Sequence, residues 1–301
     1  MDNPIIRVID LQFLDRAGTI GAYLIPYRGG GILVECGPRS TVDNLVAGLR
    51  DYGLEPEEIS DVFLTHIHLD HAGSAGWWAR QGARIHVHER GAPHLVNPEK
   101  LLASAGRLYG DQMNALWGEF IPVPETSLQI MHDQDTVRVA KLSILALDVP
   151  GHASHHLAYL IGDACFTGDI GGIRLSPLHY LRLPMPPPDL NLEQWRRSIR
   201  LIQENHPMRI VPTHFGVYAD ARWHLQAVMD ELEAVENWME ERLPLDPSPE
   251  ELRQQFIEFE RERARRYGVD QSIAEAQQIA NPSFMSADGI YRYWHKYRKP
   301  E

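Results

Sequence analysis

"LTHIHLDHAG", residues 64–73, places three histidines and an aspartate within six positions, and its surroundings indicate the fold class. The run DVFLT at 61–65 predicts a short buried strand, because it is apolar and rich in residues that favour β-structure. Gly73 and Gly76 follow, and an apolar helix begins at Trp77. The polar cluster therefore lies where a strand ends and a loop begins.

The geometry of an extended chain divides these polar side chains into two groups. Because side chains alternate along a strand, His66 and His68 point to the same side, about 7 Å apart. Asp70 and His71 follow after the chain has begun to turn, so they can face a second point beside the first. Imidazole nitrogens and carboxylate oxygens suit a borderline divalent ion such as Zn²⁺. The stretch thus predicts half of a site for two metal ions.

Three later loops carry residues of the types needed for the other half. His152 follows a predicted strand at 142–147, Asp169 follows one at 164–167, and His214 follows one at 210–211. Ligands at the ends of several strands can converge on one rim of a sheet. A lone loop histidine or aspartate is usually an ordinary surface residue, but a solvated face has no need of the HxHxDH spacing. The candidate metal ligands are His66, His68, Asp70, His71, His152, Asp169 and His214.

The predicted secondary structure changes near residue 220. Before that point predicted strands alternate with helices, which favours an α/β fold of sheet layers covered by helices. Beyond it four helix-like segments follow, at 223–241, 249–267, 271–279 and 284–299. In the second of these, Leu252, Phe256 and Phe259 repeat at helical spacing and must pack on something. We therefore expect a catalytic domain at 1–220 and a helical extension at 221–301 that packs on it.

Composition narrows the class of protein and of partner. The 301 residues include 41 acidic and 29 basic side chains, and the net charge of −12 favours a small-molecule substrate over a polyanion such as RNA. The sequence has no run of 18 apolar residues, opens without the pattern of a signal peptide, and has two cysteines, too few for a disulfide framework. We expect a cytoplasmic protein that binds neither nucleic acid nor membrane. Whether it forms a homo-oligomer is left open.

The order of the motifs resembles that of the metallo-β-lactamase superfamily over about residues 5–220. After HxHxDH at 66–71, three segments are similar to the PGHTPGH, FTGD and PxHG motifs of hydroxyacylglutathione hydrolases (glyoxalase II): Pro150–His156, Phe166–Asp169 and Pro212–Gly216. The resemblance implies a four-layer αββα sandwich with a C-terminal helical extension, and with the metals at the edge between the two sheets.

The resemblance also implies how the ligands divide between the ions. By position, one ion would be held by His66, His68 and His152, and the other by Asp70, His71 and His214, with Asp169 bridging the two. The expected cofactor is two divalent metal ions per chain, with zinc preferred over iron or manganese.

The sequence departs from the family's pattern at two places. Glu35 stands in an early turn where relatives often have aspartate, and its role is left open. In PGHASHH, which replaces PGHTPGH, His156 matches the family's second histidine and is expected to support a ligand, whereas His155 is expected to be an ordinary polar residue. Four further histidines are expected to be structural: His86, His88, His94 and His179.

The chemistry of two metal ions indicates the reaction. Ions about 3.5–4 Å apart can hold a hydroxide and polarise the oxygen on which negative charge develops. We expect a metal-dependent hydrolase whose dinuclear-site hydroxide cleaves a small carbonyl ester, preferably a thioester or a lactone. Asp70 is the expected catalytic residue, carrying a proton to the leaving group.

Three other functions are weighed against this expectation. A di-iron oxidoreductase resembling the flavodiiron proteins would typically have glutamate where His68 stands, and a flavin-binding domain that the helical end of this chain does not resemble. A phosphodiesterase or nuclease is disfavoured by the negative charge. A noncatalytic binding module is disfavoured because all seven ligand positions are filled.

Two regions are expected to select the substrate. In residues 91–127, Tyr109, Met113 and Trp117 either line a hydrophobic pocket or belong to the core. At the end of the chain, the run YRYWHKYRK at 291–299 either binds a carboxylate-bearing substrate or forms a solvated terminal helix.

Overall fold

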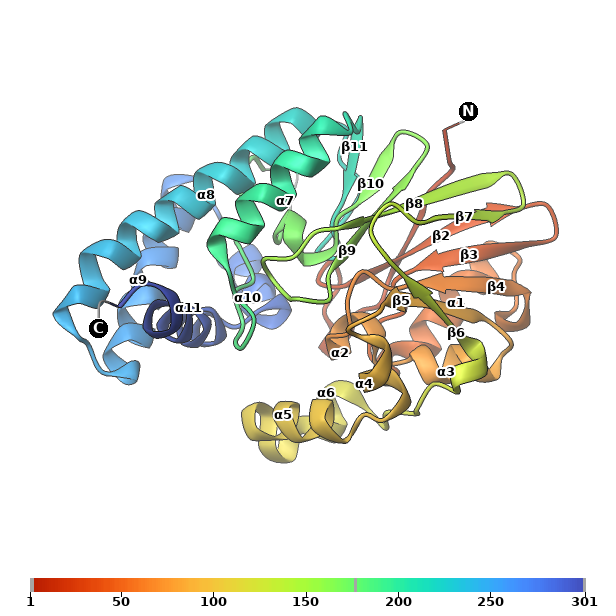
Figure 1. Cartoon of the computed structure of the whole chain (residues 1–301), viewed down its shortest axis with the longest axis horizontal. Helices are drawn as coiled ribbons and strands as arrows, with labels where there is room; N and C mark the ends of the chain where they lie inside the picture. Colours follow the sequence, from red (N-terminus) through yellow and green to blue (C-terminus); the bar gives the residue numbers. More distant parts are fainter. Residues whose placement is uncertain (1–2, 176–177, 300–301) are drawn as a thin grey trace.

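The computed structural model of the chain describes residues 3–175 and 178–299, and two sheets form one half of it, on the right in Figure 1. The first sheet follows the order of the chain: β1 (Arg7–Asp10), β2 (Gly21–Tyr27), β3 (Gly30–Val34), β4 (Ile59–Phe63), β5 (Arg84–His88) and β6 (Leu128–Met131). The second sheet has the reverse order: β11 (Arg209–Val211), β10 (Ala164–Phe166), β9 (Leu157–Ile161), β8 (Leu142–Asp148) and β7 (Thr136–Val139).

Helices surround the two sheets. The first six are α1 (Val42–Asp51), α2 (Leu69–Ala72), α3 (Ala75–Arg80), α4 (Ala92–Val96), α5 (Glu99–Tyr109) and α6 (Met113–Trp117). The others are α7 (Leu192–Glu204), α8 (Ala221–Arg242), α9 (Pro249–Arg266), α10 (Gln271–Ala280) and α11 (Ser283–Tyr297). None of the described helices combines the length and the apolar character needed to cross a membrane.

The buried apolar side chains form three clusters, and these define four layers. One cluster lies between the sheets and includes Phe63 and Tyr159. A second covers the outer face of the first sheet and includes Trp78 of α3. The third covers the outer face of the second sheet and includes Trp195 of α7. The order of helix, sheet, sheet and helix confirms the predicted αββα sandwich.

The strand directions bring the ligand-bearing loops of the second sheet to one edge. β10 pairs in parallel with β11, and β9 pairs antiparallel with both β8 and β10, so β8, β10 and β11 run in the same direction. The loops after these three strands therefore leave the sheet at the same edge. The backbone N–H of Leu157 donates to the carbonyl of Thr65, which fixes the end of β4 from the first sheet beside that edge.

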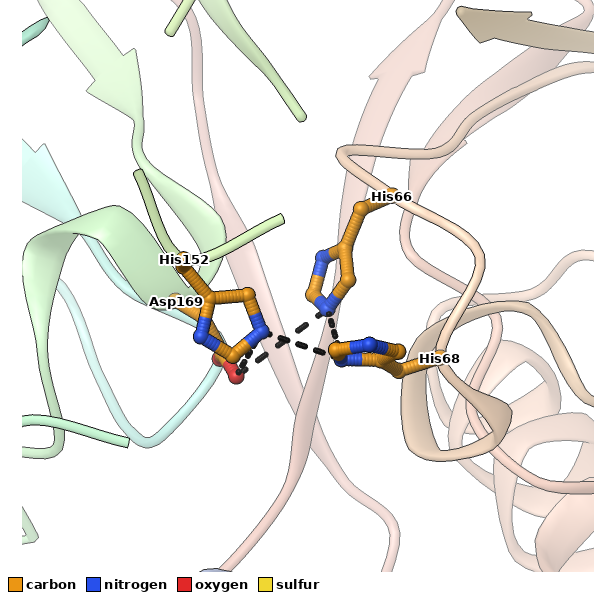
Figure 2. Close-up of side chains that lie close together, drawn as sticks. All are labelled: His66, His68, His152 and Asp169. Carbon is orange, nitrogen blue, oxygen red and sulfur yellow. Dashed lines mark hydrogen bonds and ion pairs between the residues drawn. The ribbon is translucent and has the colours of Figure 1, made fainter. Parts of the chain in front are cut away.

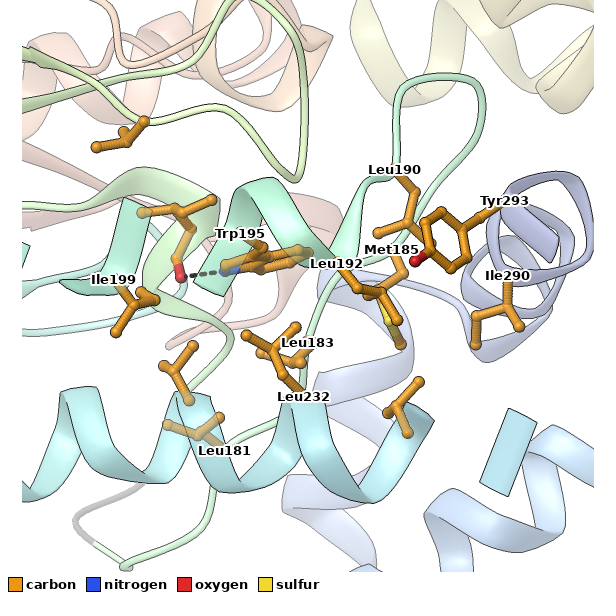
Figure 3. Close-up of a cluster of buried hydrophobic side chains, with 14 of the residues drawn as sticks. Leu181, Leu183, Met185, Leu190, Leu192, Trp195, Ile199, Leu232, Ile290 and Tyr293 are labelled. Carbon is orange, nitrogen blue, oxygen red and sulfur yellow. Dashed lines mark hydrogen bonds between the residues drawn. The ribbon is translucent and has the colours of Figure 1, made fainter. Parts of the chain in front are cut away.

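The C-terminal helices pack on the second sheet through α7 and α8. Figure 3 shows Trp195 of α7 and Ile290 of α11 in one buried cluster. Leu252 and Phe256 of α9 belong to the same cluster, and Phe259 packs against it. The predicted packing of this apolar stripe is therefore confirmed, whereas the domain boundary at residue 220 stays a prediction.

The strands predicted at 61–65, 142–147, 164–167 and 210–211 correspond closely to β4, β8, β10 and β11, and the helical segment that begins with α5 is broken before α6. α5 ends at Tyr109, and Gly110 has a φ of 50°, which glycine adopts without the penalty that a side chain would bring. A 3₁₀ turn over Gly110–Gln112 follows, and α6 begins at Met113. The short helices α2 and α4 are not predicted, because four or five residues are too few to show a hydrophobic period.

Candidate metal centre

The HxHxDH motif follows the end of β4 and runs into the turn of α2. His66 follows β4, is fully buried, and precedes His68, which stands immediately before α2. Asp70 and His71 lie within α2, where the turn brings both into contact with residues on the loops of the second sheet. The local change from strand to helix thus separates the motif into two pairs, as the sequence predicts.

The first pair meets two residues from the second sheet. Figure 2 shows His66 and His68 entering from one side, and His152 and Asp169 from the other. His68 Nδ1 lies 2.9 Å from His66 Nε2 and 3.0 Å from His152 Nε2. Asp169 Oδ2 lies 3.3 Å from His152 Nε2 and 4.0 Å from His66 Nε2. One ligand atom from each residue lies within 4.8 Å of the others, so the four can surround one cation.

The second pair forms a similar group with His214. Asp70 Oδ2 lies 3.5 Å from His71 Nε2 and 3.4 Å from His214 Nε2. Asp169 Oδ1 lies 3.3 Å from His71 Nε2 and 3.4 Å from His214 Nε2. Ligand atoms bound tetrahedrally at about 2.1 Å from Zn²⁺ would lie about 3.4 Å apart. The spacing of this group therefore fits a divalent cation, and Asp169 turns one oxygen toward each group.

Three ligand atoms in the second group have no hydrogen bond within the described part of the chain. They are His71 Nε2, His214 Nε2 and Asp169 Oδ1, and all three are buried. Buried polar atoms in folded proteins nearly always have a partner, since leaving one unpaired is costly. Asp169 Oδ1 lies within 3.4 Å of both imidazole nitrogens, and a cation that binds all three atoms explains this convergence.

Several of the candidate histidine ligands form a hydrogen bond through Nδ1, the ring nitrogen that faces away from the other candidate ligands. His152 Nδ1 donates to the carbonyl of Pro184 at 2.8 Å, and His214 Nδ1 donates to the carbonyl of Thr19 at 2.8 Å. A hydrogen bond at Nδ1 fixes the tautomer and leaves the lone pair of Nε2 free for a metal. Both rings therefore turn Nε2 toward the ligand groups.

Glu35 holds His71 in the same way, and this is the supporting residue whose role the sequence leaves open. It is buried, and its Oε1 lies 3.1 Å from His71 Nδ1. The hydroxyls of Thr65 and Thr213 donate to the same oxygen. Glu35 has a φ of 65°, so its backbone is in the left-handed region at this turn. An acidic residue directly before Cys36 and Gly37, in a turn after a strand, is the sequence signal that points to this role.

Burial and charge set the protonation of the ligands. Burial and the adjacent imidazoles hold the pKa of His66 well below its ordinary value and lower the pKa of His68 to about 4. Both rings are therefore neutral at pH 7, which is the form that binds metals. Burial alone would raise the pKa of Asp169, but the surrounding imidazoles, His71 foremost, hold it well below its usual range. The first group thus offers neutral imidazoles, whereas Asp70 and Asp169 raise the pKa of His71 and His214 against the effect of burial.

Comparison with known families agrees with this geometry. A family model described as the metallo-beta-lactamase superfamily matches residues 16–214. The chain belongs to the metallo-β-lactamase superfamily. The matched range includes all seven candidate ligands and ends at the last of them, His214. The resemblance expected from the motifs is therefore confirmed.

Two curated relatives within the superfamily carry names of acyl-thioester chemistry. The chain is 28% identical over 111 residues to hydroxyacylglutathione hydrolase of Shewanella oneidensis, which is 37% of this chain and 34% of that protein. It is 26% identical over 212 residues to an atrochrysone carboxyl ACP thioesterase of Aspergillus fumigatus, which is 69% of this chain and 54% of that protein. The chain thus spans about a third to about half of the length of these relatives.

A solved metallo-β-lactamase structure extends the similarity to the C-terminal helices. A metallo-beta-lactamase family protein from Thermus thermophilus aligns with a TM-score of 0.67 over 98% of this chain and 94% of that chain. The sequence identity is 21%, so this likeness concerns the fold alone.

The two histidines of the PGHASHH segment differ in their surroundings. His156 Nε2 accepts a hydrogen bond from the backbone N–H of Asp169 at 3.2 Å, so the expected support of a ligand is confirmed. His155, expected to be an ordinary polar residue, belongs to neither ligand group, but its ring lies 5.8 Å from that of His68 and lines the cavity beside the centre. Burial, with a smaller effect from His68, lowers the pKa of His155 to about 3.

The remaining histidines lie outside the two ligand groups. His86 Nε2 lies 2.7 Å from Asp61 Oδ1, His88 Nε2 lies 3.3 Å from Asp148 Oδ1, and His179 Nε2 lies 3.1 Å from Asp220 Oδ2. These contacts agree with the structural roles expected for them. The fourth, His94, lines the cavity.

A cavity of about 720 Å³ opens onto the centre and includes His68, Asp70 and Asp169 in its wall. Tyr109 and Trp117 line it, as one of the two interpretations predicts. Met113 does not, and packs instead against the core of the first sheet. The volume lies in the range of pockets that enclose small molecules.

The aromatic and basic run at 291–299 does not reach this cavity. Tyr293 and Trp294 are buried in the core of the second sheet's outer face. Arg298 forms ion pairs with Glu193 and Glu236. These contacts attach α11 to the rest of the protein. The expectation of a solvated terminal helix is therefore wrong for the face of α11 that carries Tyr293 and Trp294.

Proposed function

We propose that the protein is a metal-dependent hydrolase that cleaves a small carbonyl ester, a thioester or a lactone, at a centre for two divalent ions. The observation that carries this proposal is the convergence of three buried, unpartnered ligand atoms beside a cavity of small-molecule size. Zinc is the preferred ion, because histidine and carboxylate ligands at this spacing suit it.

The two groups of side chains would divide between the ions. His66, His68 and His152 would hold one ion, and Asp70, His71 and His214 the other, with Asp169 shared. When bound, two such ions supply Lewis acidity and lower the pKa of a water molecule to about 7.

Two carboxylates have distinct tasks in this proposal. Asp169 is 3% exposed and contacts ligands of both groups, so its charge offsets that of both ions. The side chain of Asp70 is 16% exposed and lines the cavity. A carboxylate open to the cavity can accept a proton and donate it to a leaving group as a general acid. We assign this proton transfer to Asp70.

Charge and cavity chemistry support a carbonyl ester over a phosphodiester. A net charge of −12 gives poor electrostatic steering of anionic polymers. The cavity wall includes many apolar side chains, among them Leu101, Leu116 and Ile279. Two relatives carry the names hydroxyacylglutathione hydrolase and ACP thioesterase. The proposed partner is accordingly a small carbonyl compound.

The test combines metal analysis with a substrate panel on one sample. Zinc-replete protein should contain two ions per chain by mass spectrometry of the metals. On that sample kcat/KM is measured for an acyl-glutathione, an acyl-lactone and bis-p-nitrophenyl phosphate. Hydrolysis of the thioester or lactone supports the proposal. A preference of about tenfold or more for the phosphodiester, about 1.4 kcal/mol of transition-state binding, overturns it, as does full activity with one ion per chain.

A further inference from the structure

Three segments that are far apart in the sequence form much of the wall of the cavity at the centre. Phe13 and Leu14 contribute from the loop after β1, and residues of α5 and α6 form a second wall. Residues 278–285, from the end of α10 and the start of α11, form a third. α5 and α6, drawn in yellow, and α10 and α11, drawn in blue, approach from different sides (Figure 1). The C-terminal extension therefore helps to form the substrate cavity.

A continuous row of aromatic and thioether groups joins these three walls. The rings of Phe13 and Trp117 stack with centroids 5.4 Å apart, and those of Trp117 and Tyr109 meet edge to face at 5.1 Å. The Tyr109 hydroxyl lies 3.5 Å from Met285 Sδ. Aromatic and thioether groups give large apolar contact surfaces. The row therefore provides an apolar floor that can accept an acyl chain or an aryl group.

The outer part of the same cavity exposes large apolar side chains. Leu14 is 50% exposed, Leu108 39% and Phe284 37%, and all three line the cavity. Leu14 also has a φ of 55°, a conformation that is unfavourable for leucine. Exposed apolar groups gathered around one cavity typically mark a binding surface. The apolar region is thus larger than a two-carbon acyl group requires.

Two cations line another part of the wall. Arg90 and Lys100 both border the cavity and are exposed. Of the carboxylates in the same cavity wall, Asp70 and Asp169 contact the histidines of the centre, and Asp189 accepts from Ser154. Arg90 itself donates a long hydrogen bond of 3.4 Å to the carbonyl of Ser154. In a chain of net charge −12, Arg90 and Lys100 are cations in the wall of the cavity that opens onto the centre, and each can pair with an anionic group of a ligand.

We propose that the substrate is a thioester that joins a large apolar acyl group to an anionic thiol. This inference rests on the proposed hydrolase function and separates the thioester from the lactone. The acyl group would occupy the row from Phe13 to Met285, and the anionic part of the thiol would lie at Arg90 and Lys100. Water adds to the carbonyl carbon and the C–S bond breaks, giving a carboxylic acid and a thiol that takes up a proton. A neutral lactone would use the apolar floor but neither cation.

The first test measures kcat/KM of the zinc-loaded protein with acetyl and octanoyl thioesters of three thiols. Coenzyme A carries phosphates, glutathione carries carboxylates, and N-acetylcysteamine is neutral. Octanoyl should exceed acetyl by at least about tenfold, because each buried methylene adds to binding. Coenzyme A or glutathione should exceed N-acetylcysteamine by about fivefold or more, and the better of the two identifies the anion. Equal rates for both chain lengths, or preference for the neutral thiol, would overturn the proposal.

Paired variants assign these preferences to the named residues. Arg90→Ala/Lys100→Ala should raise KM for the anionic thioester about tenfold and leave the neutral thioester within about twofold. Arg28→Ala/Lys141→Ala removes two exposed cations that do not line the cavity, and it should leave KM unchanged for both the anionic and the neutral thioester. Leu108→Glu should abolish the preference for octanoyl, whereas Leu245→Glu, at an exposed leucine outside the cavity, should retain it. If a cavity variant and its control variant had equal effects, the assignment of the preferences to Arg90, Lys100 and Leu108 would be contradicted.

A binding measurement separates this inference from the proposed function. Octyl-coenzyme A and octyl-glutathione are thioethers that cannot be hydrolysed, and calorimetry gives their affinity directly. Tight binding that weakens in Arg90→Ala/Lys100→Ala and Leu108→Glu supports the ligand class even if no thioester is cleaved, in which case the hydrolase proposal alone fails. Cleavage of thioesters without this dependence of binding on the two variants overturns the ligand class alone.

Discussion

Asp169 contacts ligands of both proposed ions, through Oδ2 to His152 and through Oδ1 to His71 and His214. It is buried, so its charge has little compensation from solvent and depends on what lies around it. Asp70, by contrast, contacts His71 and His214 of one group. Changes at these two carboxylates should therefore have different consequences for the number of bound ions.

The first prediction concerns that number. Asp169→Asn should lose both ions, while Asp70→Asn should lose one and retain the ion held by His66, His68 and His152. Loss of a group that merely supports a ligand typically lowers metal affinity about 10- to 100-fold, so loss of the shared ligand should exceed about 100-fold. Mass spectrometry of the metals after dialysis against a weak chelator counts the ions. Two ions retained in Asp169→Asn would show that this carboxylate is not shared.

The second prediction concerns Glu35, which holds His71 from behind. In Glu35→Gln the amide oxygen can still accept from His71, Thr65 and Thr213, but the negative charge beside His71 is lost and the NH2 group faces the Thr65 backbone N–H that Oε2 accepts from. The affinity for the second ion should fall about 10- to 100-fold, with little change at the first. Competition with a chromogenic chelator measures both affinities. Glu57→Gln, at an exposed glutamate, serves as the control, and equal affinities in the two variants would remove Glu35 from the centre.

The sequence predicts the seven candidate ligands and the supporting residue His156, but not the role of Glu35. The ligand types recur at strand ends, and four of the seven lie within six positions, so their pattern is local. Glu35 acts together with Thr65 and Thr213, and the three residues come from distant parts of the chain. Such a contact depends on how the two sheets pack, and the spacing of residues along the chain does not contain this information.

At the scale of elements, the C-terminal helices reach the centre through one loop. Arg182 donates two hydrogen bonds to Glu260 of α9, and the Met185 N–H donates to Ser286 of α11. Pro184, between them, accepts the hydrogen bond from His152 Nδ1. The helices themselves are predictable from their apolar periods and from the capping box at Ser248. The attachment of these helices to the loop cannot be predicted from the sequence, because Arg182 and Glu260 are 78 positions apart and Met185 and Ser286 are 101 positions apart.

The third prediction tests the buried ion pair of Arg182 and Glu260. Both side chains are at most 8% exposed, so Glu260→Gln leaves an uncompensated charge on a buried guanidinium. The free energy of unfolding in urea should fall by about 3–5 kcal/mol. Glu262→Gln breaks an exposed pair with Arg266 on the same helix and should cost less than about 1 kcal/mol. Similar losses in both variants would mean that the loop does not depend on this pair.

At the scale of the whole molecule, the proposed ions would join the two sheets. Each ligand group combines side chains from the end of β4 and α2 with side chains from the loops of the second sheet. Between the sheets the contacts are otherwise mainly apolar packing, with Phe63 against Tyr159 as one example. Metal binding should therefore contribute to the stability of the fold as well as to its chemistry.

The fourth prediction is that removal of the metal destabilises the whole protein. An ion that binds only the folded chain stabilises it by about 2.7 kcal/mol at a free concentration 100 times Kd, and a domain of this size then melts about 4 °C higher. Chelation should lower the melting temperature and zinc should restore it. The melting temperature of Asp169→Asn should change with neither the chelator nor zinc. Hydrogen exchange should increase in residues 64–73 and 212–216, which lie on different sheets, and remain unchanged at β7, far from the ligands along its sheet. Because both segments supply ligands to the same group, their protection should be lost together. Equal melting temperatures with and without zinc in the unsubstituted protein would show that the ions do not join the sheets.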